Sequence, residues 1–292
     1  MKNSLDCIPC LLGQAHKVAK LTNLEQSQHE ALLKETLAYL YNTSFDVTTP
    51  AISAAIWEMA TKKLNDPDPL KHIRTYYNSE MLKLEALWQD KIQIHGKEGL
   101  MLAIKLAIAG NIIDFGTPHQ FDINVVQQRI NSTLKDTLSV DDTQLLFDKL
   151  QSGKKLLYLG DNCGEVVFDK LLLKKLKKEF PHLDITFVTR GKPILNDIIK
   201  EDAYEVGIDE IANIIDNGDG APSTLMETVS DEFKNYFNSA DIIIAKGQGN
   251  FEGLFSYPNN NLFFLFMAKC NYIAEVTGAP LGGLLCKKND IK

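Results

Sequence analysis

The stretch YLGDNCGEVVFD, residues 158–169, changes from one type of secondary structure to another around a polar centre. The apolar residues that lead into it predict a buried strand, and the residues from Gly164 onward have the apolar spacing of a helix. An acid and an amide, Asp161 and Asn162, stand where the strand ends. Ligands of an open parallel sheet bind beyond the carboxyl ends of its strands, so this pair would face a site. A turn that caps the next helix is the alternative.

The rest of the C-terminal half repeats this alternation of strand and helix. We predict strands at 155–160, 184–189, 211–216, 241–246 and 261–268, with a further candidate at 282–287. Helices are expected near 164–179, 193–203, 222–237 and 270–277. Continuous apolar strands that alternate with helices are typical of a parallel sheet covered on both faces. The sequence therefore predicts an α/β fold, with a Rossmann-like, mostly parallel sheet in residues 151–292.

Residues 1–150 are predicted to be mostly helical. Thr49 and Pro50 provide an N-cap and a first helical residue for the run that follows them. The segment GLMLAIKLAIAG at 99–110 is apolar on nearly every face, so it predicts a buried helix that carries Asn111 and Asp114 into the interior. We expect two domains: residues 1–150 cover a cleft, and residues 151–292 carry a metal site in that cleft.

Composition excludes several classes of function. The 292 residues carry a formal net charge of −7, which provides no basic surface for nucleic acid. The longest apolar candidate, LFFLFMA at 262–268, is too short to span a membrane, and the first residues lack the apolar core of a secretory signal, so a cytoplasmic location is expected. Five cysteines, an odd number, argue against a disulfide framework and for thiols or metal ligands. No pattern indicates the oligomeric state.

Polar residues follow three of the predicted strands directly, at 161–162, 189–197 and 246–250. If the sheet is parallel, all three groups lie along one edge. Two carboxylates and an amide oxygen suit a hard divalent cation such as Mg²⁺ or Mn²⁺. Arg190, Lys192 and Lys246 supply the positive charge that a phosphoryl group requires. Taken singly, Asp197 fits an exposed helical acid and Lys246 an exposed lysine, and the convergence at three strand ends favours a site.

Several ordered motifs resemble one known family. G-D-N-x-G-E-x-V-F-D (160–169), R-G-K-P-I-x-N-D (190–197), K-G-Q-G-N-x-E (246–252) and A-G-N-x-I-D-F-G (109–116) are similar to motifs of the damage-control phosphatases, the ARMT-like family. The N-terminal D-C-x-x-C-L (6–11) resembles the mark of the microbial CxxC subgroup. The similarity extends to K-C-x-x-I-A-x-x-T-G-x-P (269–280), and this sequence departs from the common pattern at Cys163, where alanine is more usual.

The resemblance implies a metal-dependent phosphatase that acts on small phosphate monoesters, such as sugar phosphates or damaged phosphometabolites. The cofactor would be a divalent metal, Mn²⁺, Co²⁺, Ni²⁺ or Mg²⁺, with Asp161, Asn162 and Asp197 as its ligands. The residues expected to be catalytic are Asp161, Lys246, Asp114 and Glu165. Those expected to bind substrate are Asn111, Arg190, Lys192, Gly247, Gln248 and Asn250.

Two questions stay open at this point. The nucleophile is either a water activated by the metal or a carboxylate, and a carboxylate nucleophile would have to be an acid other than the ligands, such as Asp114 or Glu165. Other functions compete as well. A nucleotide-type enzyme on the same sheet lacks support because no G-x-G-x-x-G follows the first strand. A metal or thiol sensor would use Cys7 and Cys10, with Cys270 and His16 completing a zinc set only through long-range folding.

Overall fold

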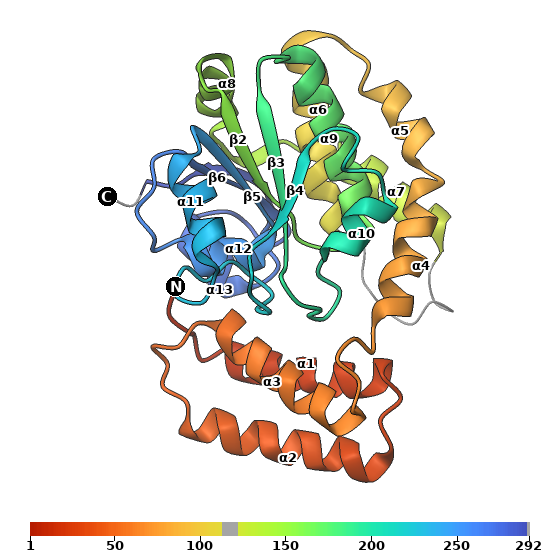
Figure 1. Cartoon of the computed structure of the whole chain (residues 1–292), viewed down its shortest axis with the longest axis vertical. Helices are drawn as coiled ribbons and strands as arrows, with labels where there is room; N and C mark the ends of the chain where they lie inside the picture. Colours follow the sequence, from red (N-terminus) through yellow and green to blue (C-terminus); the bar gives the residue numbers. More distant parts are fainter. Residues whose placement is uncertain (113–121, 291–292) are drawn as a thin grey trace.

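The computed structural model describes residues 1–112 and 122–290. Within these residues seven strands form one sheet in the order β1-β7-β6-β5-β2-β3-β4 (Figure 1). Every neighbouring pair is parallel except β6 and β7, which are antiparallel. The strands are β1 (Leu138–Asp141), β2 (Lys155–Leu159), β3 (Asp184–Thr189), β4 (Asn213–Asp216), β5 (Ile242–Lys246), β6 (Leu262–Met267) and β7 (Leu284–Lys288).

The predicted α/β class and mostly parallel sheet are confirmed, with two additions. The candidate strand at 282–287 is β7, and it runs antiparallel to its neighbour β6. Strand β1 was not predicted, because it lies in the half expected to be mostly helical and pairs with β7 at the edge of the sheet. Residues before 150 therefore contribute a strand to the sheet, and the division into two domains at 150 stays a prediction.

Helices cover both faces of the sheet. The helices are α1 (Cys7–Leu21), α2 (Gln26–Asn42), α3 (Thr49–Leu64), α4 (Lys71–Leu82), α5 (Glu85–Lys91), α6 (Gly96–Ala109), α7 (Ile123–Thr133), α8 (Thr143–Ser152), α9 (Glu165–Glu179), α10 (Lys200–Glu205), α11 (Asp231–Ser239), α12 (Gly247–Leu254) and α13 (Asn271–Thr277). The helix expected at 193–203 is replaced by an irregular segment followed by the short α10. Helix α12 begins directly after β5, within the segment that was noted only for its polar residues.

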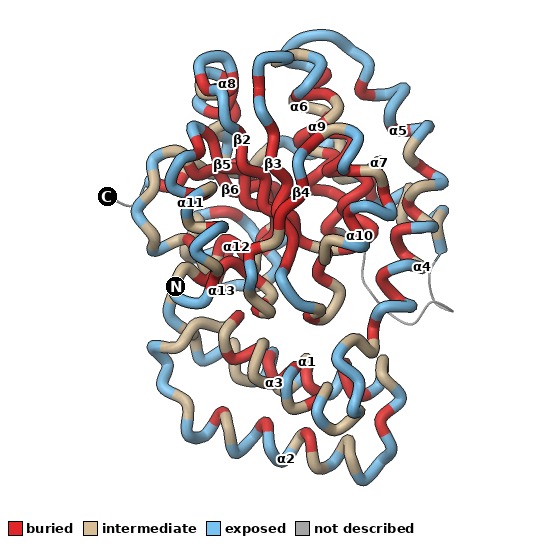
Figure 2. The backbone as a smooth tube through the Cα atoms, in the orientation of Figure 1, coloured by how far each residue is buried: buried red, intermediate tan, exposed pale blue. Residues whose placement is uncertain are grey.

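Successive residues of the central strand β2 enter two different cores. Tyr158 packs in the core formed with α6 and α9, whereas Leu157 and Leu159 pack in the core formed with α11, α12 and α13. This alternation follows from the strand geometry, in which neighbouring side chains point to opposite faces. Both faces of β2 are therefore apolar, as the continuous apolar run predicted, and buried residues concentrate along the sheet in Figure 2.

Helix α6 is buried, as its composition predicted, and packs closely on α9. A side-chain carbon at Gly110, just after α6, would lie 2.7 Å from the ring of Phe168 on α9. The absence of a side chain therefore allows the end of α6 to approach α9, and Asn111 follows immediately as a buried residue. Asp114 lies outside the described residues.

Helices α1, α2 and α3 form a separate layer beyond the carboxyl ends of β2 and β3 (Figure 1). They share a small apolar cluster that includes Leu11 and Ile56. The layer is tied to the sheet edge by Trp57, whose indole Nε1 donates a hydrogen bond to the carbonyl of Pro193 at 3.0 Å. The segment that follows β3 is thus held from the side opposite the sheet.

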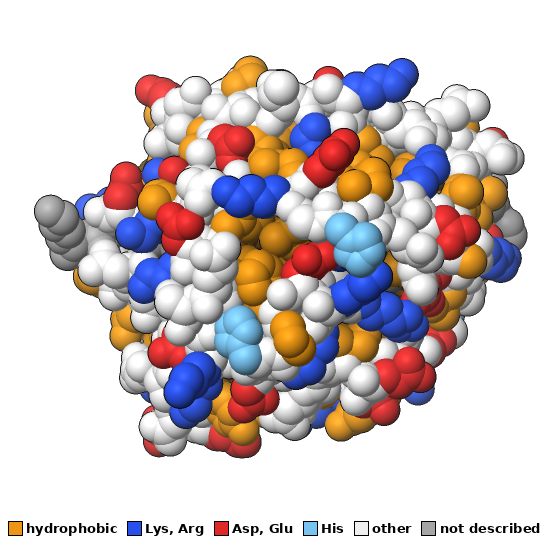
Figure 3. Space-filling model, turned by 90° about the horizontal axis from the view of Figure 1, so that it is seen from above, with side chains coloured by type: hydrophobic (Ala, Val, Ile, Leu, Met, Phe, Trp, Pro, Cys, Tyr) orange, Lys and Arg blue, Asp and Glu red, His pale blue; other side chains and the backbone are white. Residues whose placement is uncertain are grey.

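None of the described helices combines the length and apolar composition that a membrane crossing requires. Figure 3 views the molecule from above, the end at which β2 and β3 begin. Acidic and basic side chains are interspersed there around a central apolar area.

Candidate functional site

The register of the sheet brings three strand ends together. Leu159 at the end of β2 pairs with Val188 of β3 on one side and with Ala245 of β5 on the other. The chain turns to β3 on one side of β2 and returns to β5 on the other, so β2 and β5 flank a topological switch point. Crevices at such points are the usual ligand sites of open parallel sheets. The polar residues after β2, β3 and β5 therefore share one edge, as predicted.

The segment after β3 folds back onto the end of β2. The amide of Ile198 donates to the carbonyl of Asp161 at 2.9 Å, and the amide of Cys163 donates to the carbonyl of Asn196 at 3.0 Å. These bonds form an antiparallel bridge between Asn162 and Asp197. Asp197 is consequently buried beside Asp161 and is not the exposed helical acid that its local sequence also fitted.

Two amides hold the Asp161 carboxylate. Asn111 Nδ2 donates to Asp161 Oδ2 at 2.8 Å, and Asn162 Nδ2 donates to the same oxygen at 2.6 Å. Asn162 is itself fixed, because its Oδ1 accepts a bond from Asn196 Nδ2 at 2.7 Å. Asn111 follows the end of α6, so the N-terminal half places a side chain beside Asp161, and the substrate-binding role expected for Asn111 stays a prediction.

Arg190 contacts the carboxylates of Asp161 and Asp197, and Asn250 holds Arg190. Arg190 Nε donates to Asp197 Oδ2 at 2.7 Å, and Nη1 donates to Asn250 Oδ1 at 3.0 Å. Asn250 Nδ2 in turn donates to the carbonyl of Lys246 at 2.7 Å, which links α12 to β5. Arg190 Nη2 lies 3.5 Å from Asp161 Oδ1 and has no hydrogen-bond partner within the described part of the chain.

Glu165 and Lys246 form a fully buried ion pair next to the Asp161 carboxylate. Lys246 Nζ donates to Glu165 Oε1 at 2.7 Å, to Asp169 Oδ1 at 2.6 Å and to the carbonyl of Ala107 at 2.8 Å. Glu165 Oε2 accepts from Asn162 Nδ2 at 3.2 Å and also from the side chain of Asn111. An ammonium group has three N–H donors, so all three are used. Phosphate binding by Lys246 stays a prediction, and it would require one of these bonds to break.

The buried side chains of the site carry an excess of negative charge. Four buried carboxylates, Asp161, Glu165, Asp169 and Asp197, accompany two buried cations, Arg190 and Lys246. Burial, followed by the charges of Glu165 and Asp197, raises the pKa of Asp161 to about 8. Burial also raises the pKa of Asp169 to about 6 against the effect of Lys246, and raises the pKa of Asp197 against the effect of Arg190. With all four carboxylates ionised, these six side chains carry a formal charge of minus two, which matches one divalent cation.

Gly247 leaves space for the Asp161 carboxylate. Its φ is +81°, and a side-chain carbon at this position would lie 1.9 Å from Asp161 Oδ2. Across residues 1–112 and 122–290 no three His, Cys, Asp or Glu side chains are grouped so as to bind a metal by themselves. Asp161 and Asp197 provide carboxylate oxygens of the hard type that Mg²⁺ and Mn²⁺ prefer. The Asn162 side chain directs its Nδ2 to Asp161 and its Oδ1 to Asn196. The assignment of these three residues as metal ligands stays a prediction.

The side chains of Lys192 and Gln248 interact with residues other than Asp161, Glu165 and Asp197. Lys192 is exposed, and its charge lowers the pKa of Glu58 on α3, after the larger effects of Lys62. Gln248 Nε2 donates to Glu252 Oε1 at 2.8 Å, and Oε1 accepts from the amide of Lys269 at 2.9 Å. The structure thus brings most of the predicted residues together and directs these two side chains elsewhere.

Lys269 is a residue that the sequence reasoning did not assign. It is exposed, and its positive charge lowers the pKa of Asp161 against the larger effect of burial, so it lies near that carboxylate. Lys269 follows β6 almost directly, as the other groups follow β2, β3 and β5. A search for polar residues directly after the predicted strand at 261–268, like the search made at the three other strand ends, would have found Lys269.

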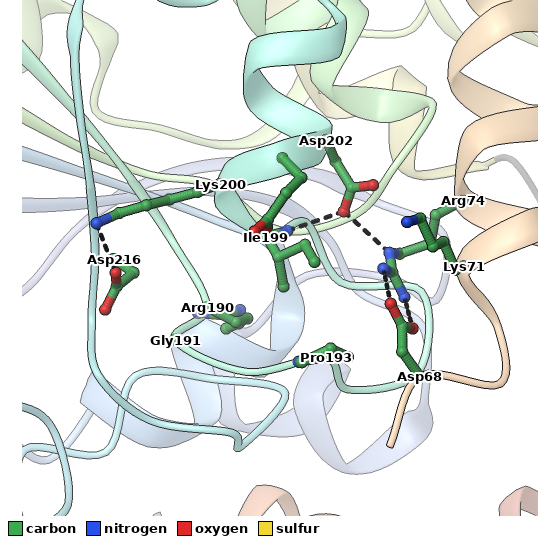
Figure 4. A pocket seen from close by; sticks show the side chains of 11 residues that line it. Asp68, Lys71, Arg74, Arg190, Gly191, Pro193, Ile199, Lys200, Asp202 and Asp216 are labelled. Carbon is green, nitrogen blue, oxygen red and sulfur yellow. Dashed lines mark hydrogen bonds and ion pairs between the residues drawn. The ribbon is translucent and has the colours of Figure 1, made fainter. Parts of the chain in front are cut away.

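A cavity of about 320 Å³ lies beside the site, between the start of α4 and the segment after β3 (Figure 4). Arg74 forms a two-pronged ion pair with Asp68, at 2.6 and 2.8 Å, and donates through Nε to Asp202 at 2.9 Å. On the other side Lys200 pairs with Asp216 at 2.7 Å. Most charges of this cavity are thus satisfied, and neither Asp161 nor Asp197 lines it.

Long-range folding brings the cysteine pair toward Cys270. Loss of hydration raises the pKa of the Cys10 thiol, and its neighbours Cys7 and Cys270 add to the effect. His16 Nδ1 is hydrogen bonded to His29 Nε2 at 2.9 Å, and within residues 1–112 and 122–290 no group of three His, Cys, Asp or Glu side chains could hold a metal. The four-residue zinc set considered from the sequence is therefore not assembled among the described residues, and membership of the CxxC subgroup stays a prediction.

Comparison with known proteins supplies the family. A damage-control phosphatase of Pyrococcus horikoshii is 31% identical over 100% of both chains. An uncharacterized protein of Methanocaldococcus jannaschii is 33% identical over 95% of this chain and 92% of its own. A crystal structure of a DUF89 family protein from Pyrococcus horikoshii has a TM-score of 0.90 at 29% identity, covering 99% of this chain and 100% of the other. A family model described as the damage-control phosphatase ARMT1-like domain matches residues 4–285, and the chain therefore belongs to this phosphatase family, which confirms the resemblance of its motifs.

Proposed function

We propose that the protein is a metal-dependent phosphatase that hydrolyses small phosphate monoesters, such as sugar phosphates or damaged phosphometabolites. The observation that carries the proposal is the buried excess of negative charge at the switch point of the sheet. Asp161, Asn162 and Asp197 would hold a divalent cation there, Mn²⁺, Co²⁺, Ni²⁺ or Mg²⁺. When bound, such a cation polarises phosphoryl oxygens and lowers the pKa of water.

The chain provides three groups for the phosphate. Helix α12 begins at Gly247 with no side-chain cap, and the free amides of a helix N-terminus favour an anion. Arg190 Nη2 is a buried donor with no hydrogen-bond partner among the described residues, and it lies beside Asp161. Lys269 adds an exposed ammonium near the same carboxylate. We propose that these groups stabilise charge on the transferred phosphoryl group. Lys246 acts indirectly in this proposal, because its ammonium group holds the Glu165 carboxylate in place.

The contacts of Glu165 bear on the identity of the nucleophile. Both of its oxygens accept hydrogen bonds, Oε1 from Lys246 and Oε2 from Asn111 and Asn162. A carboxylate held in this way is poorly placed to attack phosphorus. We therefore propose that water, and not Glu165, is the nucleophile, and that Glu165 orients the two amides that support Asp161.

The test is phosphate release from a panel of phosphate monoesters after chelator treatment, with each metal added back. We expect the chelator to abolish release, a divalent metal to restore it, and thiol alkylation to leave it intact. Asp161→Asn should abolish release and weaken metal binding measured by titration calorimetry. Asp184→Asn, which changes an exposed acid at the start of β3, is the matched control and should do neither. Phosphate release that survives the chelator, or that disappears on alkylation alone, would contradict the proposal and favour a thiol-based function.

A further inference from the structure

Besides Glu165, a second buried acid, Asp169, bonds to the Lys246 ammonium group. It stands on α9 one helical turn after Glu165 and is fully buried. Its Oδ1 accepts two bonds, from Lys246 Nζ at 2.6 Å and from the hydroxyl of Tyr158 at 2.7 Å. Its Oδ2 is buried and has no hydrogen-bond partner in the part of the chain described by the structure. Residues four apart on a helix face the same way, so Asp169 and Glu165 point together toward Lys246.

The network connects elements that are distant in the sequence. Tyr158 comes from β2, Asp169 and Glu165 from α9, and Lys246 from the end of β5. Lys246 also donates to the carbonyl of Ala107 in the last turn of α6, the helix that leads to Asn111. A cation at a helix C-terminus interacts favourably with its free carbonyl groups. Lys246 thus bonds both to Glu165 and to the helix that leads to Asn111.

We propose that Asp169 is a positioning residue for the phosphatase reaction: with Tyr158 it fixes Lys246, which holds Glu165 and the end of α6 so that their groups align Asp161. The inference rests on the proposed function, because the geometry it maintains is that of the proposed metal site. Asp169 itself touches neither Asp161 nor Asp197 in any hydrogen bond of the described residues. Its effect is therefore indirect.

The charges explain why a second acid is needed. Without Asp169, the Lys246 ammonium would have one anionic partner, Glu165, and would be drawn toward it alone. A buried ion pair keeps its geometry only when its remaining donors and acceptors are satisfied. Asp169 gives Lys246 an opposing partner, so that Glu165 stays free to accept the amides of Asn111 and Asn162 through its other oxygen.

The test uses Asp169→Asn, because asparagine can keep an oxygen for both bonds at Oδ1 while it removes the charge and places an amide nitrogen at the buried Oδ2 position. At saturating metal we expect kcat per folded molecule to fall at least tenfold, with KM changed less than threefold. Tyr158→Phe removes one support of Asp169 and should lower kcat less. The control is Glu85→Gln, which removes an acid whose lysine partners, Lys170 and Lys174, stand on the opposite side of the same α9 helix. This variant should lose stability without a change in kcat.

A double-mutant cycle separates positioning from stability. If Asp169 acts through Glu165, Asp169→Asn should lower kcat little further in the Glu165→Gln background. Additive losses in the two variants would overturn the proposal, as would a kcat within twofold of the parent for Asp169→Asn.

A spectroscopic measurement keeps the test independent of activity. In protein labelled with ¹⁵N-asparagine, Asp169→Asn should shift the side-chain amide resonances of Asn111 and Asn162, and Glu85→Gln should not. A parent protein that releases no phosphate from any ester would refute the proposed function, while these resonances would still decide the role of Asp169. Unchanged resonances in Asp169→Asn would refute the positioning role even if the phosphatase activity is confirmed.

Discussion

Gly247→Ala is the substitution whose effect the structure defines most sharply. Gly247 has a φ of +81°, and an added side-chain carbon would lie 1.9 Å from Asp161 Oδ2 and 2.2 Å from its Cγ. Ordinary contacts with such a carbon begin at 3.4 Å. The Asp161 carboxylate would therefore have to move by about 1.5 Å, away from the position in which two amides hold it.

The expected magnitude has two parts. The left-handed backbone conformation costs an alanine about 1–2 kcal/mol of stability. The displacement acts on function instead, because an error of about 1 Å in a reacting group costs about 100-fold in rate. We therefore expect a loss of at least about 100-fold in metal-dependent phosphate release, about 2.7 kcal/mol in the barrier. Metal affinity should fall in parallel, since Asp161 is a proposed ligand.

Gly278→Ala is the matched control, because Gly278 has a φ of +71° and nothing lies within 4 Å of the added carbon. It should lose about the same stability from its backbone, about 1–2 kcal/mol, and retain its activity. The assay is thermal unfolding together with metal titration calorimetry and phosphate release for both variants. If Gly247→Ala binds metal as the parent does, or if Gly278→Ala loses metal equally, the placement of Asp161 against Gly247 does not determine the site.

Three further predictions address charge, thiols and substrate. Burial raises the pKa of Asp161 from 3.8 to about 8, so the folded, metal-free protein retains a proton that the unfolded chain releases. Its melting temperature should therefore fall as the pH rises from about 4 to about 8 and recover when Mn²⁺ is added; a melting temperature that rises over this range without metal would contradict the charge balance. A Cys7→Ser/Cys10→Ser variant should keep phosphate release per folded molecule within about threefold of the parent, because the proposed metal ligands are oxygens. The cysteine pair would belong to the functional site if the parent binds stoichiometric zinc that the variant lacks and if phosphate release falls by more than about tenfold. Lys269→Ala should raise KM for the phosphate ester while leaving metal affinity unchanged in calorimetry, because an ammonium interacts with the phosphoryl group and not with the cation; loss of metal binding in this variant would show a different role.

The sequence by itself determined the class of the fold and the edge at which the site lies. Apolar runs such as that of β2 and β5 are local patterns, and strand, helix and turn follow from local periodicity. The position of Asp161 and Asn162 after a strand was equally local, and in a parallel sheet such residues share one edge. Ordered motifs over most of the chain also identified the family, which the comparisons confirmed.

Only the tertiary structure decided what each charged side chain contacts. Asp197 is buried because the segment after β3 folds back on Asp161, and Lys246 is buried because α6 and α9 supply all of its acceptors. Strand β1 likewise finds its partner β7 more than a hundred residues away in the sequence. The partners of a buried charge are set by long-range packing and by the cost of leaving that charge unpaired, and no local pattern in the sequence encodes either of these.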